Sequence, residues 1–131
     1  MSLLKLSQKS LINFDPIDMS KDILMAFNNF GLIQNAYLFG SGAQGKMTPD
    51  SDLDILITFR NTQELALARE EFIHSKQNIA IDWIFKTQID FENEKSFGGV
   101  SYEAFHFGIQ IKWRKINIEN TKKTMQKYYL L

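Results

Sequence analysis

Two apolar runs flank a polar loop in this chain, and the acidic pair Asp52 and Asp54 opens the second run. The first run ends at Gly40-Ser41, and ten residues separate Ser41 from Asp52. Because side chains alternate faces along a strand, the two carboxylates point the same way, roughly 7 Å apart. Ionising both costs energy unless a cation lies between them. A hard divalent ion such as Mg²⁺, which binds one or two carboxylates together with substrate phosphates, meets that need.

The Gly40-Ser41 pair offers backbone N–H groups at the end of the first apolar run, and such groups bind phosphate. Glycine also lets the backbone approach a ligand where a Cβ would obstruct it. Taken singly, Gly-Ser is a turn and Asp-x-Asp is a solvated strand edge. Taken together at this spacing, they predict a site for a metal ion and a nucleotide.

The arrangement Gly40-Ser41, ten residues, then Asp52-x-Asp54 resembles the signature of the DNA polymerase β-like nucleotidyltransferase superfamily. The small size points to its minimal nucleotidyltransferase (MNT) branch, and the resemblance covers about residues 20–86. It implies a third catalytic carboxylate on a later strand. Asp82 is the candidate, because it is an acid inside an otherwise apolar run, where a charge is expensive unless it is paired or metal-bound.

The resemblance implies roles for individual residues. Asp52, Asp54 and Asp82 would be the catalytic residues and the ligands of two Mg²⁺ ions. Gly40, Ser41 and Lys46 would bind the nucleotide, with ATP as the donor substrate. Lys46 has an alternative interpretation as an ordinary loop lysine.

The implied reaction transfers a nucleoside monophosphate, AMP from ATP, to a hydroxyl. Many members of the MNT branch modify a tyrosine of a helical HEPN-family toxin, and the same role would make this chain an antitoxin. Many superfamily members carry basic residues where this chain has Gly42 and Gln44. That departure keeps open a catalytically weak or inactive binding module that neutralises its partner by contact. A third alternative is a small-molecule nucleotidyltransferase acting as a homodimer, so a homo-oligomer is also a candidate assembly.

The length of 131 residues predicts one domain over 1–131, with its core at about 16–86 and a C-terminal strand and helix at about 101–131. A hydrophobic content of 44% is sufficient for folding, and no apolar run approaches a membrane span. The absence of cysteine and of a long apolar leader favours a cytoplasmic protein. With no room for a strand-binding domain, nucleic acid is not an expected partner.

Hydrophobic spacing predicts an α+β fold, a mixed β-sheet with helices packed mainly on one face, as in the superfamily's palm-like core. Asp15-Pro16 predicts a helix start and Gly31 its stop. The capping-box sequence 61–64 opens a second helix that ends near Lys76. The predicted strands are 36–39, 53–59, 78–85 and the alternating segment 105–113; residues 87–100 are predicted to be a loop and 119–129 a terminal helix.

Overall fold

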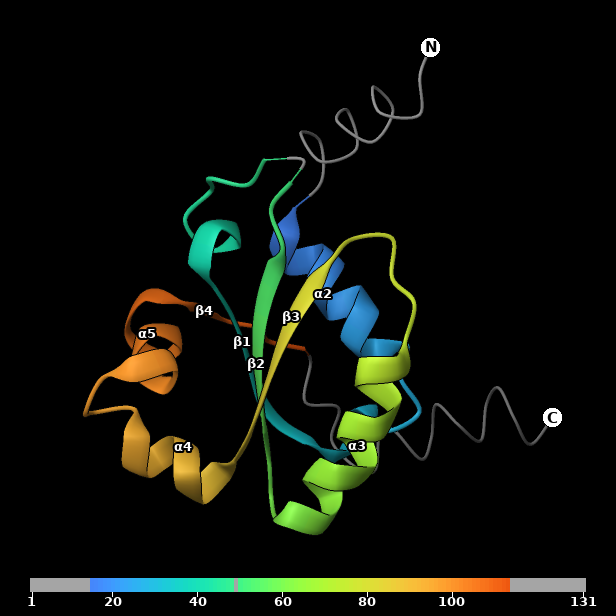
Figure 1. Ribbon diagram of the computed structural model, residues 1–131, viewed down its shortest axis with the longest axis vertical. Coiled ribbons are helices and arrows are strands. Elements are labelled where there is room, and N and C mark those ends of the chain that lie inside the picture. Colours follow the sequence, from blue (N-terminus) through green and yellow to red (C-terminus); the bar gives the residue numbers. More distant parts are fainter. Residues whose placement is uncertain (1–14, 49, 114–131) are drawn as a thin grey trace, which may run out of the picture.

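The computed structural model describes residues 15–48 and 50–113 (Figure 1). The elements in chain order are α2 (Pro16–Met25), η1 (Phe30–Leu32), β1 (Ile33–Phe39), η2 (Gly40–Gly42), β2 (Leu53–Phe59), α3 (Thr62–His74), β3 (Ile81–Thr87), α4 (Gln88–Glu94), α5 (Gly99–Phe107) and β4 (Ile109–Gln110). Within these ranges, no helix combines the length and the apolar character that crossing a membrane would require.

The four strands form one sheet in the order β3-β2-β1-β4. β1 runs antiparallel to both β2 and β4, whereas β2 and β3 are parallel. The predicted mixed α+β sheet is therefore confirmed. The parallel pair matters for the site, because it brings the N-terminal ends of β2 and β3 together at one end of the sheet.

The larger core lies between the sheet and the helices α2 and α3 (Figure 1). Alternate residues of β2 enter it, and Leu53, Ile55 and Ile57 are fully buried. Phe72 of α3 stacks on Phe27 with ring centroids 3.9 Å apart. Burying an aromatic side chain of this size removes roughly 150–250 Å² from water, so this cluster anchors α3 to the sheet.

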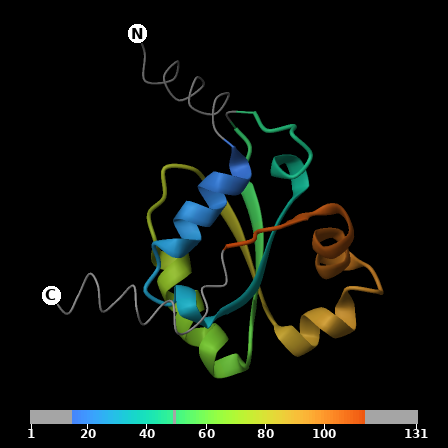
Figure 2. The same ribbon diagram turned by 180° about the vertical axis from the view of Figure 1, so that it is seen from behind.

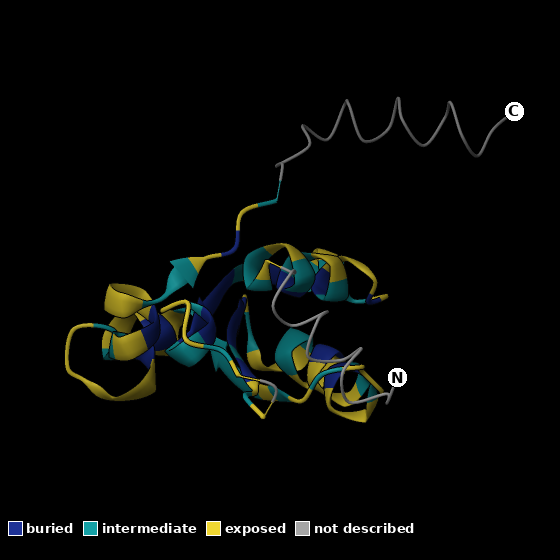
Figure 3. Ribbon diagram, turned by 90° about the horizontal axis from the view of Figure 1, so that it is seen from above, coloured by how far each residue is buried: buried dark blue, intermediate teal, exposed yellow. Residues whose placement is uncertain are grey.

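A smaller core lies on the opposite face, under α4 and α5 (Figure 2). Phe91 of α4 is fully buried and stacks on Tyr37, with centroids 5.1 Å apart. Ala104 of α5 is also fully buried, and its small side chain lets that helix lie close to β1. In Figure 3 the buried stretches, in dark blue, lie on the strands and on parts of the helices that flank them. Helices therefore also cover the face that carries the even-numbered residues of β2, so the prediction that they pack mainly on one face is wrong.

The predicted helix starts and the central strand are confirmed. The Asp15 carboxylate accepts from the Ile17 N–H at 2.8 Å and caps α2. The Asn61 side chain accepts from the Glu64 N–H at 2.9 Å and caps α3. β2 spans the predicted residues 53–59, while β1 begins earlier, at Ile33, and β3 begins later, at Ile81.

The predicted end of the first helix at Gly31 is wrong, because α2 ends at Met25. The Glu71 carboxylate of α3 accepts hydrogen bonds from the backbone N–H groups of Asn28 and Asn29, at 2.8 and 2.9 Å. A tertiary partner thus takes the donors that another helical turn would have used.

Two predictions for the C-terminal half are wrong. Residues 87–100 contain the helix α4, whose start is capped by Thr87, and the segment 105–113 is not one long strand. Residues 99–107 form α5 instead, and β4 has only two residues. Phe105 and Phe107, which supplied the alternation, are both exposed, so the pattern did not reflect burial. The predicted helix 119–129 lies outside the described residues.

Candidate active site

Asp54 of β2 and Asp82 of β3 are directly opposed in the parallel ladder. Neighbouring strands lie about 4.8 Å apart, so these two side chains emerge side by side from one face of the sheet. Leu56, the next residue of β2 on that face, enters the smaller core. The sheet therefore juxtaposes the two carboxylates and presents them above the core that α4 and α5 cover.

The pKa of the Asp54 carboxyl is raised, first by partial burial and then by the charge of Asp82. The charge of Asp52, a side-chain hydrogen bond with Asp82 and the charge of Glu103 raise it further. Each of these effects penalises the ionised form. The cluster thus holds more negative charge than its own surroundings compensate, and a bound cation would relieve that cost.

Gly40 is packed against Asp54. It follows β1 directly, at the end where Phe39 pairs with Asp54, and its φ of +67° lies in the left-handed region that favours glycine. A Cβ at this position would overlap the Oδ2 atom of Asp54. The Gly-Ser turn and the acidic pair are therefore in contact, as a shared metal and phosphate site requires.

The loop between β1 and β2 folds back on the Gly-Ser turn. The Lys46 N–H donates to the Ser41 carbonyl at 3.0 Å, which holds the backbone of Lys46 beside Ser41, while its side chain is exposed. Further along, the Thr48 N–H donates to Ser51 Oγ at 2.9 Å, and the Ser51 N–H donates to the Thr48 carbonyl at 3.0 Å. This turn directs the chain into Asp52 and β2.

The donor set suits Mg²⁺, which takes oxygen ligands and binds proteins through one or two carboxylates. Asp54 and Asp82 supply that pair, and Gly40 lets the backbone approach the Asp54 carboxylate closely, where a Cβ would overlap it. Asp52 is exposed and lies near enough for its charge to act on Asp54. Across residues 15–48 and 50–113, however, no three acidic, histidine or cysteine side chains are already arranged to share an ion. Ion binding by all three acids would require side-chain rotation.

Glu103 is an acidic neighbour that the sequence did not predict. It is exposed on α5, and its charge contributes to the raised pKa of Asp54. The interpretation of 105–113 as a strand concealed it, since only a helix at 99–107 carries this residue over the sheet. No sequence motif marked it.

Lys86 lies on the same strand face as Asp82, four residues further along β3. Its Nζ forms an ion pair with Glu94 of α4, at 2.9 Å. The hydrogen bond from Lys86, followed by that from Ser101, lowers the pKa of the Glu94 carboxyl. Within one chain, Lys86 is therefore bound to α4.

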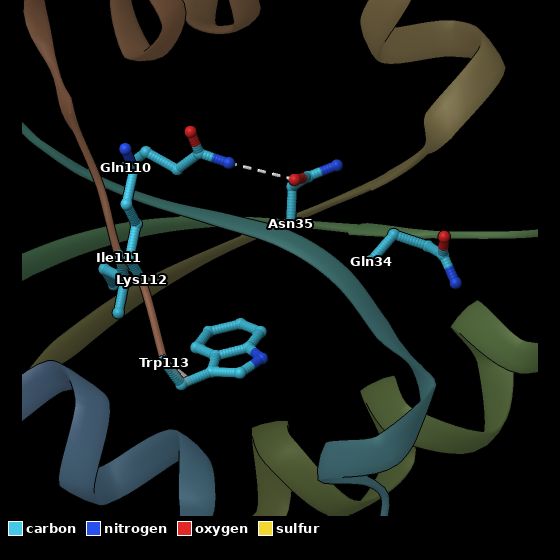
Figure 4. Close-up of a pocket in the computed structure, with 6 residues that line it drawn as sticks. All are labelled: Gln34, Asn35, Gln110, Ile111, Lys112 and Trp113. Atoms are coloured by element: carbon cyan, nitrogen blue, oxygen red, sulfur yellow. Dashed lines mark hydrogen bonds between the residues drawn. The ribbon is translucent and has the colours of Figure 1, made fainter. Parts of the chain in front are cut away.

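A separate pocket lies beside β4, far along β1 from Asp54 (Figure 4). Its volume is about 260 Å³, and Gln34, Asn35, Gln110, Ile111, Lys112 and Trp113 line it. The Gln110 side chain donates to Asn35 Oδ1 at 3.0 Å. None of the clustered acids borders this pocket, so we do not assign it to the active site.

The family model of the nucleotidyltransferase domain matches residues 20–107, which include β2 with Asp54 and β3 with Asp82. The chain belongs to this family. The match extends beyond the stretch of about 20–86 where the sequence pattern was recognised, and it includes α4 and α5. None of the curated proteins matches this nucleotidyltransferase domain.

Three solved structures resemble it at low identity. A putative nucleotidyltransferase from Sulfolobus solfataricus is 18% identical, with 88% of this chain and 91% of that chain covered and a TM-score of 0.45. A mutant of the toxin–antitoxin pair MntA–HpeT gives 15% identity, 87% and 88% coverage and a TM-score of 0.44. A toxin–antitoxin structure with AMP-PNP gives 16%, 89% and 90%, and 0.43. The family assignment rests on the family model and not on these three.

Proposed function

We propose that this nucleotidyltransferase uses Mg²⁺ to transfer AMP from ATP to a hydroxyl acceptor. The observation that carries the proposal is the direct pairing of Asp54 with Asp82, with Gly40 packed against the first of them. Asp52, Asp54 and Asp82 are proposed to hold the metal. Gly40, Ser41 and Lys46 are proposed to hold the phosphates, through backbone N–H groups, the Ser41 hydroxyl and the Lys46 ammonium.

In this reaction the acceptor oxygen attacks the α-phosphorus, a new P–O bond forms, and the bond to the leaving pyrophosphate breaks. Asp82 is exposed and is proposed to accept the proton of the attacking hydroxyl. Bound Mg²⁺ would supply charge stabilisation at the entering and leaving oxygens. Gly40 and Ser41 are proposed to orient the triphosphate, because the backbone of Gly40 lies against the Asp54 carboxylate that would hold the metal.

We further propose that the acceptor hydroxyl is a tyrosine of a helical, HEPN-type protein and that the chain acts as an antitoxin. Exposed apolar side chains on and before α5 support a protein partner: Phe97 is 88% exposed and Phe107 64%. α5 also carries Glu103, whose charge reaches Asp54, so a protein bound there would meet the site. Exposed aromatic surface of this kind commonly marks an interaction surface.

The alternative is a binding module that neutralises its partner without transfer. Gly42 is buried and Gln44 is exposed, and neither brings positive charge to the phosphate cradle. Charge-assisted contacts are roughly twice as strong as neutral ones, so the affinity for a triphosphate would be lower without them. In this alternative, the protein still binds its partner after Asp54 and Asp82 are substituted.

The test is incubation of the full chain with ATP labelled at the α-phosphorus, Mg²⁺ and the product of the neighbouring gene. We expect label on the partner, its loss with Asp82→Asn, and retention with Asp50→Asn, an exposed loop acid. Label that persists at the wild-type level in Asp82→Asn would overturn the assignment of Asp82. Absence of label, with partner binding intact, would favour the binding module.

A further inference from the structure

The outer edge of β3 carries an unused set of backbone hydrogen-bonding groups. β3 ends the sheet order, and among the described residues no strand pairs with its outer side (Figures 1 and 2). The Leu53 N–H donates to the Ala80 carbonyl at 2.9 Å, which shows that the even-numbered residues of β3 direct their backbone groups toward β2. Alternate residues therefore turn toward β2, and the backbone groups of Ile81, Trp83, Phe85 and Thr87 point outward.

Open strand edges of this length pair with other strands unless something blocks them. β3 has no proline, and a groove of about 500 Å³, lined by both polar and apolar residues, lies beside its first half. Ile73, Ile79 and Trp83 are among the side chains that line the groove. The edge thus offers both backbone hydrogen bonds and apolar surface to an incoming strand.

The sequence of β3 is complementary to itself when it is reversed. An antiparallel pair centred on Ile84 opposes Ile84 with Ile84, Trp83 with Phe85, and Asp82 with Lys86. The outward-facing residues then form the hydrogen-bonded pairs. Asp82, Ile84 and Lys86 form the closer, non-hydrogen-bonded pairs, with Cα atoms about 4.5 Å apart. Aromatic pairs and opposite-charge pairs across strands both stabilise a sheet.

We propose that two copies of this chain associate through antiparallel pairing of their β3 edges, which places the partner's Lys86 beside Asp82 of the active site. The occupant is a second copy because charged and apolar side chains of β3 match one another in this two-fold register. The argument for the dimer depends only on the open edge of β3, whereas the role of the partner's Lys86 in the site rests on the function proposed above.

The partner's Lys86 would supply what the site requires. Asp52, Asp54, Asp82 and Glu103 make a negative cluster, and the proposed substrate is a polyanion. A lysine ammonium has three donors, so Lys86 can keep its bond to Glu94 and still contact the site of the other copy. A cation beside Asp82 favours binding of the phosphates there.

The first experiment uses the absence of cysteine from the chain. Ile84→Cys introduces a single thiol that opposes itself across the two-fold axis, within the range that a disulfide spans. Oxidation is expected to convert most of this variant to a covalent dimer. Val100→Cys, on α5 away from β3, is the matched control and should remain mainly monomeric on denaturing gels. Equal yields of dimer from the two variants would overturn the proposed register.

The second experiment measures mass by sedimentation equilibrium of the full chain. We expect a species of twice 15.2 kDa, and Lys86→Glu should weaken the dimer about tenfold or more, because it opposes like charges. Asp82→Lys combined with Lys86→Glu restores opposite charges and should recover the dimer. Glu94→Gln, which removes only the contact within one chain, should leave it unchanged.

A wild-type mass of one chain at all concentrations, or no recovery in the double variant, would overturn the interface. Neither readout depends on activity, so the two proposals fail separately. If the dimer forms and the wild type does not bind Mg²⁺-ATP, only the proposed function and the site role of the partner's Lys86 fall. If Mg²⁺-ATP binds and the chain is monomeric, only the interface falls.

Discussion

Asp54 and Asp82 are partners in the parallel ladder of β2 and β3, and the charge of Asp82 raises the pKa of the Asp54 carboxyl. The sheet holds two acids together that would separate if they were free in water. Burial and like charge both raise the pKa of Asp54. The folded chain therefore bears an electrostatic cost at this position, which a bound cation would remove.

Because ionisation of Asp54 is unfavourable in the folded chain, we predict that Asp54→Asn stabilises the metal-free protein at neutral pH. The amide keeps the shape and hydrogen-bonding capacity of the side chain and removes a charge that the fold disfavours. We expect the midpoint of thermal unfolding in EDTA to rise by a few degrees. Asp50→Asn, in the exposed loop, should leave it unchanged. A lowered midpoint for Asp54→Asn would show that the carboxylate stabilises the metal-free fold.

The raised pKa of Asp54 also fixes the sign of one contribution to pH dependence. The folded state holds this proton more tightly than the unfolded chain, so the contribution is favourable at low pH and is lost as pH rises through the folded-state pKa. Glu92 and Glu94 have lowered pKa values and act in the opposite direction. The measurement is therefore the difference in unfolding free energy between wild type and Asp54→Asn in EDTA. The unfolding free energy of the wild type should fall relative to that of Asp54→Asn as pH rises from about 4 to 7.

Alanine substitutions at Gly40 and Gly45 distinguish the effect of backbone strain from the effect of a clash with Asp54. Gly40 and Gly45 have φ values of +67° and +69°, so alanine is similarly strained at both. Only at Gly40 would the new Cβ overlap Asp54; nothing lies within 4 Å of one at Gly45. We expect both variants to lose roughly 1 kcal/mol of stability and only Gly40→Ala to lose Mg²⁺-ATP binding in calorimetry. Equal binding by the two variants would remove Gly40 from the site.

The smaller core should hold α4 and α5 over the site. Phe91→Ala deletes a fully buried ring that stacks on Tyr37, and large-to-small changes of this kind cost about 3–5 kcal/mol. Phe97→Ala, at a highly exposed position, should cost less than about 0.5 kcal/mol. Urea unfolding followed by circular dichroism measures both. A Phe91→Ala cost similar to that of Phe97→Ala would show that this core contributes little.

The sequence predicted the part of the fold where local signals and burial agree. β2 was predicted with its observed bounds, because its apolar residues are buried from both faces. The caps at Asp15 and Asn61 were predicted because a side-chain acceptor precedes each helix. The spacing from Gly40-Ser41 to the Asp pair led to a site assignment that stays a prediction, and Phe39 beside Gly40 does pair with Asp54.

The rest depended on tertiary contacts that the sequence does not show. Phe105 and Phe107 alternate with polar residues as in a strand, yet they are exposed on α5. The small buried residue Ala104 packs α5 on the sheet, and Ser101 donates a hydrogen bond to Glu94 of α4. Neither residue gives a strong periodic signal in the sequence. Glu103 was missed for the same reason. The start of α4 could have been predicted, since Thr87 caps it by accepting from the Asp90 N–H at 3.2 Å.

The most direct test of the account is isothermal titration calorimetry of the full chain with a non-hydrolysable ATP analogue in the presence and absence of Mg²⁺. We predict Mg²⁺-dependent binding by the wild type and by Gly45→Ala, and its loss in an Asp54→Asn, Asp82→Asn double variant that remains folded. Binding of equal strength by the double variant, or wild-type binding that is indifferent to Mg²⁺, would contradict the claim that this acidic pair holds a metal-bound nucleotide.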